Sequence, residues 1–290
     1  MKLSNAIKLT IVMLIWASSW IFIKFSLGYV KPFSLAFLRF FLASILLFPI
    51  AMLRKKGEMQ KFSLSDLKIY CILALTGVTL LYVFEFIALL YTTAINASLL
   101  INLSVIFVAL FTFFFWGERL ERSALAGIVI SLVGVFLIVT KGKPFEFFTE
   151  KSFIGDLLII SSAFLWMVYT IVGKKFLERK DPLVATAYTF ALGTIFLIPF
   201  AFYDNLASIF EIPFITWLAI LYLAIFCSVI GYFIWAQVIK EELASKVSVF
   251  LYMVPLFTAV FSVIFLNEEI TIFIILGGFL VIFGVHLAEK

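Results

Sequence analysis

Two copies of one pattern, offset by 150 residues, occupy nearly the whole chain. The pattern is clearest from Ala97 to Thr140, where a charged segment at 118–122 joins two apolar runs. Residue types that seldom match by chance in an apolar chain recur at this offset. The pairs are Trp16 and Trp166, Lys24 and Lys174, Pro32 and Pro182, Pro49 and Pro199, Tyr82 and Tyr232, Ser98 and Ser248, Glu118 and Glu268, Gly127 and Gly277, and Gly134 and Gly284. The repeat predicts two structurally related halves.

Composition places both halves in a membrane. The chain is 64% hydrophobic and 13% charged, whereas soluble domains are about half apolar and about a quarter charged. The two cysteines, Cys71 and Cys227, lie inside apolar runs, so they predict neither a disulfide framework nor a metal site. Basic residues occur in short clusters between apolar runs, which indicates topology signals rather than nucleic-acid binding.

Ten apolar runs are long enough, or nearly so, to cross a bilayer as helices. The strict alternation of a β-barrel strand is missing from them, so we predict an all-α integral membrane protein. The expected helices are 6–27, 33–53, 67–90, 97–116, 124–140, 154–172, 183–203, 214–239, 247–266 and 272–288.

The distribution of Lys and Arg predicts orientation. If the N-terminus is cytoplasmic, most of the 22 basic residues fall on inside loops or termini. Outside loops then hold Lys31, Lys141, Lys143 and Lys151. The positive-inside rule therefore predicts a multi-pass protein of the cell membrane with both termini in the cytoplasm. Five helices per copy is an odd number, so the second copy enters from the opposite side. Such inverted repeats are typical of transporters, with the substrate site near the midplane between the halves.

The residues resemble the EamA family of the drug/metabolite transporter superfamily. The opening of the first copy, from Trp16 to Lys24 with Pro32 and Arg39, is similar to the start of an EamA domain. The Gly-Glu-Arg-Leu segment at 117–120 is similar to its close. The second copy matches more closely in Gly231-Tyr-Phe-Ile-Trp-Ala, in Leu251-Tyr-Met-Val-Pro-Leu-Phe and at Glu268. The resemblance implies two EamA repeats, at 1–141 and 153–290, joined by a linker at 142–152. Two positions depart from the family pattern: Val105 stands where proline is usual, and Glu85 is not a family residue.

Polar and aromatic groups inside the bilayer are the candidates for a binding site, because each is costly there. Their spacing places them on corresponding faces of the two halves, which suits a mainly apolar pocket with a few polar anchors. The predicted substrate-binding residues are Trp16, Trp20, Lys24, Arg39, Tyr82, Glu85, Ser98, Asn102, Trp166, Thr170, Tyr232, Trp235, Ser248 and Tyr252.

Structural roles compete with binding for many of these residues. Trp and Tyr also form interfacial belts and core packing. Ser98, Asn102 and Ser248 also suit hydrogen bonds between helices, and Lys24 is close enough to a helix end to reach water. The small residues Gly127, Ser131, Gly134, Gly277 and Gly284 indicate close packing of the fifth and tenth helices. In the family these helices are peripheral, so we leave them out of the site.

Three charges are expected at one depth in the outer half of the membrane. Lys24, Arg39 and Glu85 lie roughly 5–10 Å below the outer helix ends at 1.5 Å per residue. We therefore hypothesise that Glu85 pairs with Arg39 and that the spare cation attracts a substrate anion. Glu85 is also a candidate proton-coupling group, and a purely structural ion pair is the competing interpretation.

Proline chemistry predicts a hinge. Pro255 should interrupt the ninth helix near mid-membrane, since proline frees a backbone carbonyl. Val105 leaves the fourth helix without this device, so we expect the ninth helix to move more.

An enzyme is disfavoured because the chain holds one histidine, no paired carboxylates and no catalytic motif. A P-loop is also missing, so ATP does not drive transport from within this chain.

We predict a secondary transporter or facilitator that exports a small metabolite, such as an amino acid or similar compound, by alternating access. A lipid flippase is the alternative. The expected partners are a small-molecule substrate and the bilayer, with no catalytic residue, metal or cofactor and no nucleic acid, and the chain is compatible with a monomer.

Overall fold

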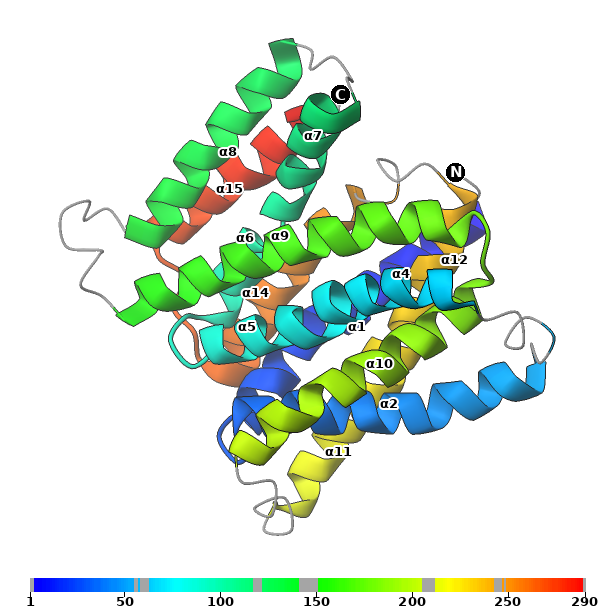
Figure 1. Ribbon diagram of the computed structural model, residues 1–290. Coiled ribbons are helices and arrows are strands. Elements are labelled where there is room, and N and C mark those ends of the chain that lie inside the picture. Colours follow the sequence, from blue (N-terminus) through cyan, green and yellow to red (C-terminus); the bar gives the residue numbers. More distant parts are fainter. Residues whose placement is uncertain are drawn as a thin grey trace.

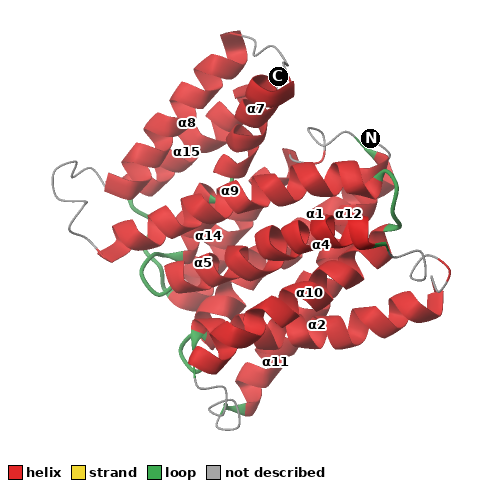
Figure 2. Ribbon diagram, in the orientation of Figure 1, coloured by secondary structure: helices red, strands yellow, loops and turns green. Residues whose placement is uncertain are grey.

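The computed structural model describes residues 3–54, 57, 63–116, 122–140, 151–204, 212–242, 247 and 249–288. All regular secondary structure within these ranges is helical (Figure 2). The first half contains α1 (Leu3–Ser26), α2 (Pro32–Arg54), α4 (Leu64–Ala74), the π-helical segment η1 (Leu75–Thr79), α5 (Leu80–Ala88), α6 (Ala94–Leu100), α7 (Leu103–Trp116) and α8 (Arg122–Thr140). The second half contains α9 (Lys151–Leu177), α10 (Pro182–Tyr203), α11 (Phe214–Tyr222), the π-helical segment η4 (Leu223–Ile230), α12 (Gly231–Glu241), the 3₁₀ turn η5 (Val249–Tyr252), α14 (Met253–Leu266) and α15 (Ile272–Ala288).

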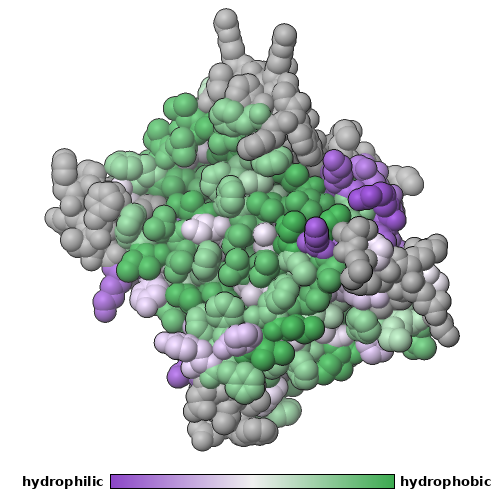
Figure 3. Space-filling model, viewed as in Figure 1, coloured by the Kyte–Doolittle hydropathy of each residue, from purple (hydrophilic) through white to green (hydrophobic). Residues whose placement is uncertain are grey.

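These segments occupy all ten predicted runs, so the all-α fold class is confirmed. Within the described ranges, six spans are long and apolar enough to cross a membrane, and four shorter apolar helices accompany them. Apolar residues cover the middle of the visible face, and hydrophilic ones gather at its opposite ends (Figure 3). This distribution is expected for a protein whose middle faces lipid.

Local sequence explains where several helices begin. The Asp181 carboxylate accepts hydrogen bonds from the backbone N–H groups of Leu183 and Val184, and Pro182 occupies the first position of α10. Both features are typical of helix N-termini. Asp204, which follows α10, accepts from the N–H groups of Phe33 and Ser34 at 2.8 and 3.2 Å. One carboxylate therefore ties the end of α10 to the start of α2.

Contacts between the halves follow a two-fold pattern. α2 packs on α10 and α8 packs on α15, which pairs equivalent helices of the two copies (Figure 1). α1 packs on α14 and on the α11–η4–α12 segment, while its equivalent α9 packs on α6–α7 and on the α4–η1–α5 segment. Exchange of the two halves leaves this set of contacts unchanged, as an inverted repeat requires.

Residues related by the 150-residue offset touch each other directly. Ser44 and Thr194 share a hydrogen bond of 3.0 Å between their hydroxyls, and the ring centroids of Phe40 and Phe190 are 5.2 Å apart. Equivalent residues can meet only near the axis that relates the halves. The pseudo-two-fold axis therefore passes between α2 and α10.

Close packing of α8 on α15 depends on glycine. A Cβ at Gly134 would lie 2.6 Å from the carbonyl oxygen of Gly277, and one at Gly284 would lie 2.5 Å from that of Gly127. These two contacts are equivalent under the repeat. The Ser131 hydroxyl donates to the carbonyl of Val281 at 3.3 Å in the same seam. The predicted close packing of these helices is confirmed.

Two predicted continuous helices are interrupted at equivalent places. α6 and α7 are separated at residues 101–102, and η5 precedes α14. Pro255 is the third residue of α14, where the missing N–H breaks no bond. The ninth helix is therefore interrupted just before Pro255, in η5, rather than at Pro255 itself, and the role of Pro255 as a hinge stays a prediction.

The fourth helix is interrupted as well, although it has no proline there. The Asn102 side-chain amide donates to the carbonyl of Ser98 at 2.8 Å. Asparagine competes with the backbone for such carbonyls, which opens the helix at this point. Both helices are therefore interrupted in the structure, and the unequal movement expected for the ninth helix stays a prediction.

Candidate functional site

A cavity of about 80 Å³ lies between the two halves. At roughly 10–15 Å³ for each water centre, it has room for several water molecules or a small solute. Both repeats contribute to its walls. The lining residues are Trp16, Ser19, Trp20, Arg39, Leu81, Tyr82, Glu85, Ile101, Asn102, Ser104, Trp166, Tyr232, Leu251 and Val254.

The cavity lies on the pseudo-two-fold axis. Trp16 and Trp166 meet edge to face with centroids 5.8 Å apart, and the hydroxyls of Tyr82 and Tyr232 are 2.8 Å apart. Each pair consists of equivalent residues, and all four line the cavity. This is the location that inverted-repeat transporters use for substrate.

Arg39 is a buried cation in the cavity wall, only 1% exposed. Its Nε donates to the Ser228 hydroxyl at 2.8 Å, and one terminal nitrogen donates to the Tyr82 hydroxyl at 3.3 Å. The guanidinium carbon lies 4.4 Å from the centroid of the Tyr82 ring. The other terminal nitrogen, Nη1, has no hydrogen-bond partner among the described residues. These contacts therefore fix the orientation of the guanidinium, and its Nη1 N–H groups remain available to donate hydrogen bonds.

The two π-helical segments supply backbone acceptors at equivalent positions. The Tyr232 hydroxyl donates to the carbonyl of Gly77 in η1 at 3.1 Å. The Trp16 indole N–H donates to the carbonyl of Cys227 in η4 at 3.0 Å. π-Helical turns leave carbonyls available and are frequent at functional sites. They orient the aromatic rings around the cavity.

The structure does not form the predicted ion pair between Arg39 and Glu85. Glu85 lines the same cavity and is 7% exposed, but no nitrogen of Arg39 lies within 4.0 Å of its carboxylate. Ser228 and the Tyr82 ring hold the guanidinium instead. The prediction failed because depth alone does not show which partners a side chain takes, and Ser228 and Tyr82 occupy the guanidinium.

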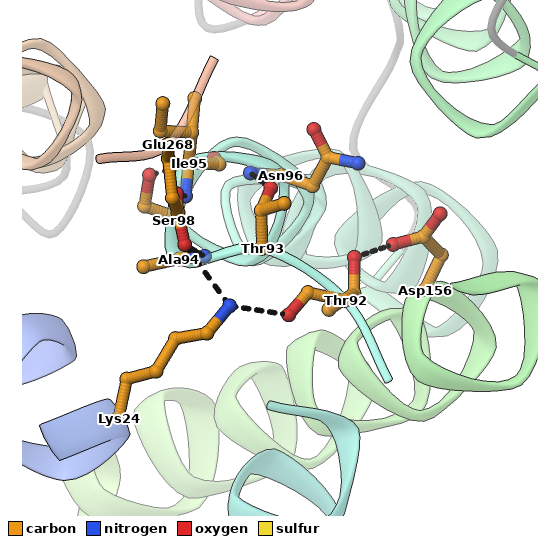
Figure 4. A network of polar contacts seen from close by, with 9 residues as sticks. All are labelled: Lys24, Thr92, Thr93, Ala94, Ile95, Asn96, Ser98, Asp156 and Glu268. Atoms are coloured by element: carbon orange, nitrogen blue, oxygen red, sulfur yellow. Dashed lines mark hydrogen bonds and ion pairs between the residues drawn. The ribbon is translucent and has the colours of Figure 1, made fainter. Parts of the chain in front are cut away.

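Lys24 is not the predicted spare cation of the cavity. Its Nζ donates to Glu268 Oε1 at 3.0 Å and to the carbonyl of Thr92 at 2.9 Å (Figure 4). Glu268 also accepts from the N–H groups of Ala94 and Ile95 at 2.8 and 3.1 Å. A carboxylate at a helix N-terminus is favoured by the helix dipole. This cluster joins the ends of α1, α5 and α14 to the start of α6.

A related cluster joins helix ends on the other side. Lys174, the equivalent of Lys24, donates to the carbonyls of Ile239 and Glu242, each at 3.3 Å. Glu242 is the equivalent of Thr92, so the two lysines bond to matching carbonyls. The Asn5 amide donates to Glu242 Oε1 at 3.1 Å and to Glu241 Oε2 at 3.3 Å. Polar contacts therefore tie helix ends together at both sides of the cavity.

Eight of the predicted residues line the cavity. The eight are Trp16, Trp20, Arg39, Tyr82, Glu85, Asn102, Trp166 and Tyr232. The Ser98 hydroxyl bonds within its own helix, to the carbonyl of Ile95. Trp235 packs behind the lining, with its centroid 5.3 Å from that of Trp16, and Thr170 is buried outside the lining. Ser248 and the side chain of Tyr252 lie outside the described residues.

Sequence reasoning missed several residues of the site. Ser228 holds Arg39, while Ser19 and Ser104 line the cavity. The residue 150 positions away from each of these serines is of a different type, so comparison of the two copies did not indicate a binding role for them. A search for any hydroxyl within an apolar run would have found all three. Among the described residues, no cluster of three His, Cys, Asp or Glu side chains is placed to hold a metal ion.

Comparison with known proteins gives consistent matches along the chain. The model of the EamA-like transporter family matches residues 4–140 and 153–288. An uncharacterized transporter of Archaeoglobus fulgidus is 48% identical over 282 residues, covering 96% of this chain and 95% of the relative. The uncharacterized transporter YyaM of Bacillus subtilis is 32% identical over 270 residues, covering 92% and 87%. A solved crystal structure shares the fold with a TM-score of 0.67 and 21% identity, covering 99% of this chain and 97% of that one.

Proposed function

Because the chain belongs to the EamA-like transporter family, we propose that it is a secondary transporter or facilitator that exports a small metabolite through the axial cavity. The observation that carries this proposal is the position of a buried, incompletely bonded cation in a cavity shared by both repeats. A single chain supplies the whole cavity, so we propose a monomeric transport unit.

The substrate that fits this cavity carries a carboxylate or similar anionic group. Arg39 presents a fixed guanidinium with an unused N–H group, and charged hydrogen bonds of this kind suit planar oxyanions. Trp16, Trp20 and Trp166 provide apolar surface beside it. Amino acids and similar compounds combine an anionic group with a compact apolar body.

We propose that transport proceeds by alternating access, and the two polar clusters at the helix ends support this. We propose that the Lys24–Glu268 contact closes the outer side and opens when substrate leaves. The equivalent cluster on the inner side is the one in which Lys174 bonds to the carbonyls of Ile239 and Glu242. Exchange between equivalent contacts is the motion that an inverted repeat favours.

Metabolite profiling tests the transport function. Cells that produce the protein and matched cells that lack it are compared for small molecules inside and outside. Export of a carboxylate-bearing metabolite should raise its outside concentration only in the producing cells, and purified protein in liposomes should move the same compound. Identical profiles together with inactive proteoliposomes would contradict the proposal.

The proposed location is the cell membrane with both termini cytoplasmic, from the charge distribution. Short epitope tags at each terminus should be protected from protease in intact cells and cleaved after permeabilisation. Lys24 and Glu268 should then be reached by impermeant reagents only from outside. A terminus cleaved in intact cells would contradict the inverted arrangement.

A further inference from the structure

We infer that Glu85 selects substrates that carry a cationic group together with the anionic one, so that the site prefers zwitterions to simple anions. This inference rests on the proposed transport function and concerns the same cavity. It assigns Glu85 a role in specificity rather than in holding the protein together.

The first observation is that the Glu85 carboxylate is not used by the fold. Glu85 is 7% exposed, and within the described ranges no hydrogen bond or ion pair reaches its carboxylate. By contrast, carboxylates with a structural role elsewhere in the chain accept several hydrogen bonds from the protein. Glu268 accepts from Lys24 and two backbone N–H groups, and Asp204 accepts from two others. A carboxylate in an apolar bundle without such partners needs another reason to be there.

The second observation is the unused donor on Arg39 in the same cavity. Nη1 has no partner among the described residues, and the guanidinium is held away from Glu85 by Ser228 and Tyr82. The cavity thus contains one positive and one negative group that are not in contact. Arg39 keeps its hydrogen bonds to Ser228 and Tyr82, but two buried charges of opposite sign that do not contact each other are still costly. A zwitterion can satisfy both groups at once, with its carboxylate toward Arg39 and its ammonium toward Glu85.

The third observation is that both charges come from one half. The equivalents of Arg39 and Glu85 are Thr189 and Trp235, which are neutral. The cavity therefore has a symmetric aromatic frame and a one-sided pair of charges. This gives a bound molecule one orientation along the charge pair. A simple anion in that orientation would face the Glu85 carboxylate, which disfavours it.

Matched substrates test this selectivity in proteoliposomes. The probes are natural amino acids with apolar side chains, from alanine to tryptophan, each paired with its 2-hydroxy acid, which lacks the ammonium group. Wild-type protein should prefer the amino acid in each transported pair. Glu85→Gln should reduce this preference by about tenfold or more, the size expected for loss of a charge-assisted hydrogen bond. Glu85→Asp, which retains the charge, should keep the order of preference even where transport is slower.

Glu178→Gln makes the same chemical change at an exposed position just past the end of α9 and should leave the preference unaltered. Equal transport of amino and hydroxy acids by wild type, or an unchanged preference in folded Glu85→Gln, would overturn the inference while leaving transport itself established. Loss of a pH gradient effect in Glu85→Gln with unchanged preference would assign Glu85 to proton coupling instead, which also overturns it. A wild-type protein that moves no small solute would instead contradict the proposed function.

Discussion

Replacing Arg39 by glutamine is expected to reduce transport of a carboxylate-bearing substrate by about 10- to 100-fold at low substrate concentration. Hydrogen bonds to charged groups contribute roughly 1.5–3 kcal/mol, and each 1.4 kcal/mol is about tenfold in affinity. Glutamine keeps polar atoms near Ser228 and Tyr82 but removes the charge. The loss should appear mainly as a raised KM, because the aromatic frame remains.

Two variants separate recognition from folding in this experiment. Arg39→Lys keeps the charge but loses the planar fork that bonds to Ser228 and Tyr82 together, so partial transport is expected. Arg54→Gln, at the exposed end of the same helix, should transport normally. Each variant is also purified and analysed by size-exclusion chromatography, so that loss of transport can be distinguished from loss of folding. Wild-type KM in a folded Arg39→Gln variant would show that the cavity charge does not bind substrate.

Replacing Gly134 by valine is expected to destabilise the protein strongly. A Cβ at this position would lie 2.6 Å from the carbonyl oxygen of Gly277 and 2.8 Å from the backbone nitrogen of Val281. Both obstacles are backbone atoms, so α8 and α15 must separate to make room. Overpacking costs about 1–3 kcal/mol and more when backbone has to shift. The midpoint of thermal unfolding in detergent should fall accordingly.

The control for this change is Ala126→Val, on the exposed side of α8. It adds two methyl groups to the same helix facing away from the seam, and the midpoint should stay close to that of wild type. If Gly134→Val melts at the wild-type temperature, the close approach of α8 to α15 does not exist as described.

The helices and their order could be predicted because the bilayer imposes a length on each apolar run. The repeat then related the halves, and Trp16, Trp166, Tyr82 and Tyr232 could be assigned to one region from their spacing in the chain. Their direct contacts at the axis follow from the inverted symmetry. Eight of the residues predicted from sequence line the cavity, whereas Trp235, which contacts both Trp16 and Trp166, packs behind the lining.

The remaining features depend on contacts between residues that are far apart in the chain. The periodicity of apolar residues does not indicate which of them meet. Lys24 and Glu268 are 244 residues apart, and only the packing of α1 on α14 brings them together. The predicted Arg39–Glu85 pair does not form because Ser228, which is 189 residues from Arg39, and Tyr82 hold the guanidinium instead. The break before α7 was missed because Asn102, rather than a proline, supplies it.

Transport through the axial cavity by alternating access is tested most directly with a single cysteine in the cavity wall. Ser104→Cys is made in a Cys71→Ser, Cys227→Ser background and exposed to a membrane-impermeant thiol reagent from either side of sealed vesicles. The residue lines the cavity and is 3% exposed. Labelling is expected from both sides, and transported substrate should slow it on both. Glu268→Gln, which loses the ion pair with Lys24, should speed labelling from the outside. A cysteine that reacts from one side only, in the presence and absence of substrate and in the Glu268→Gln variant, would contradict alternating access through this cavity.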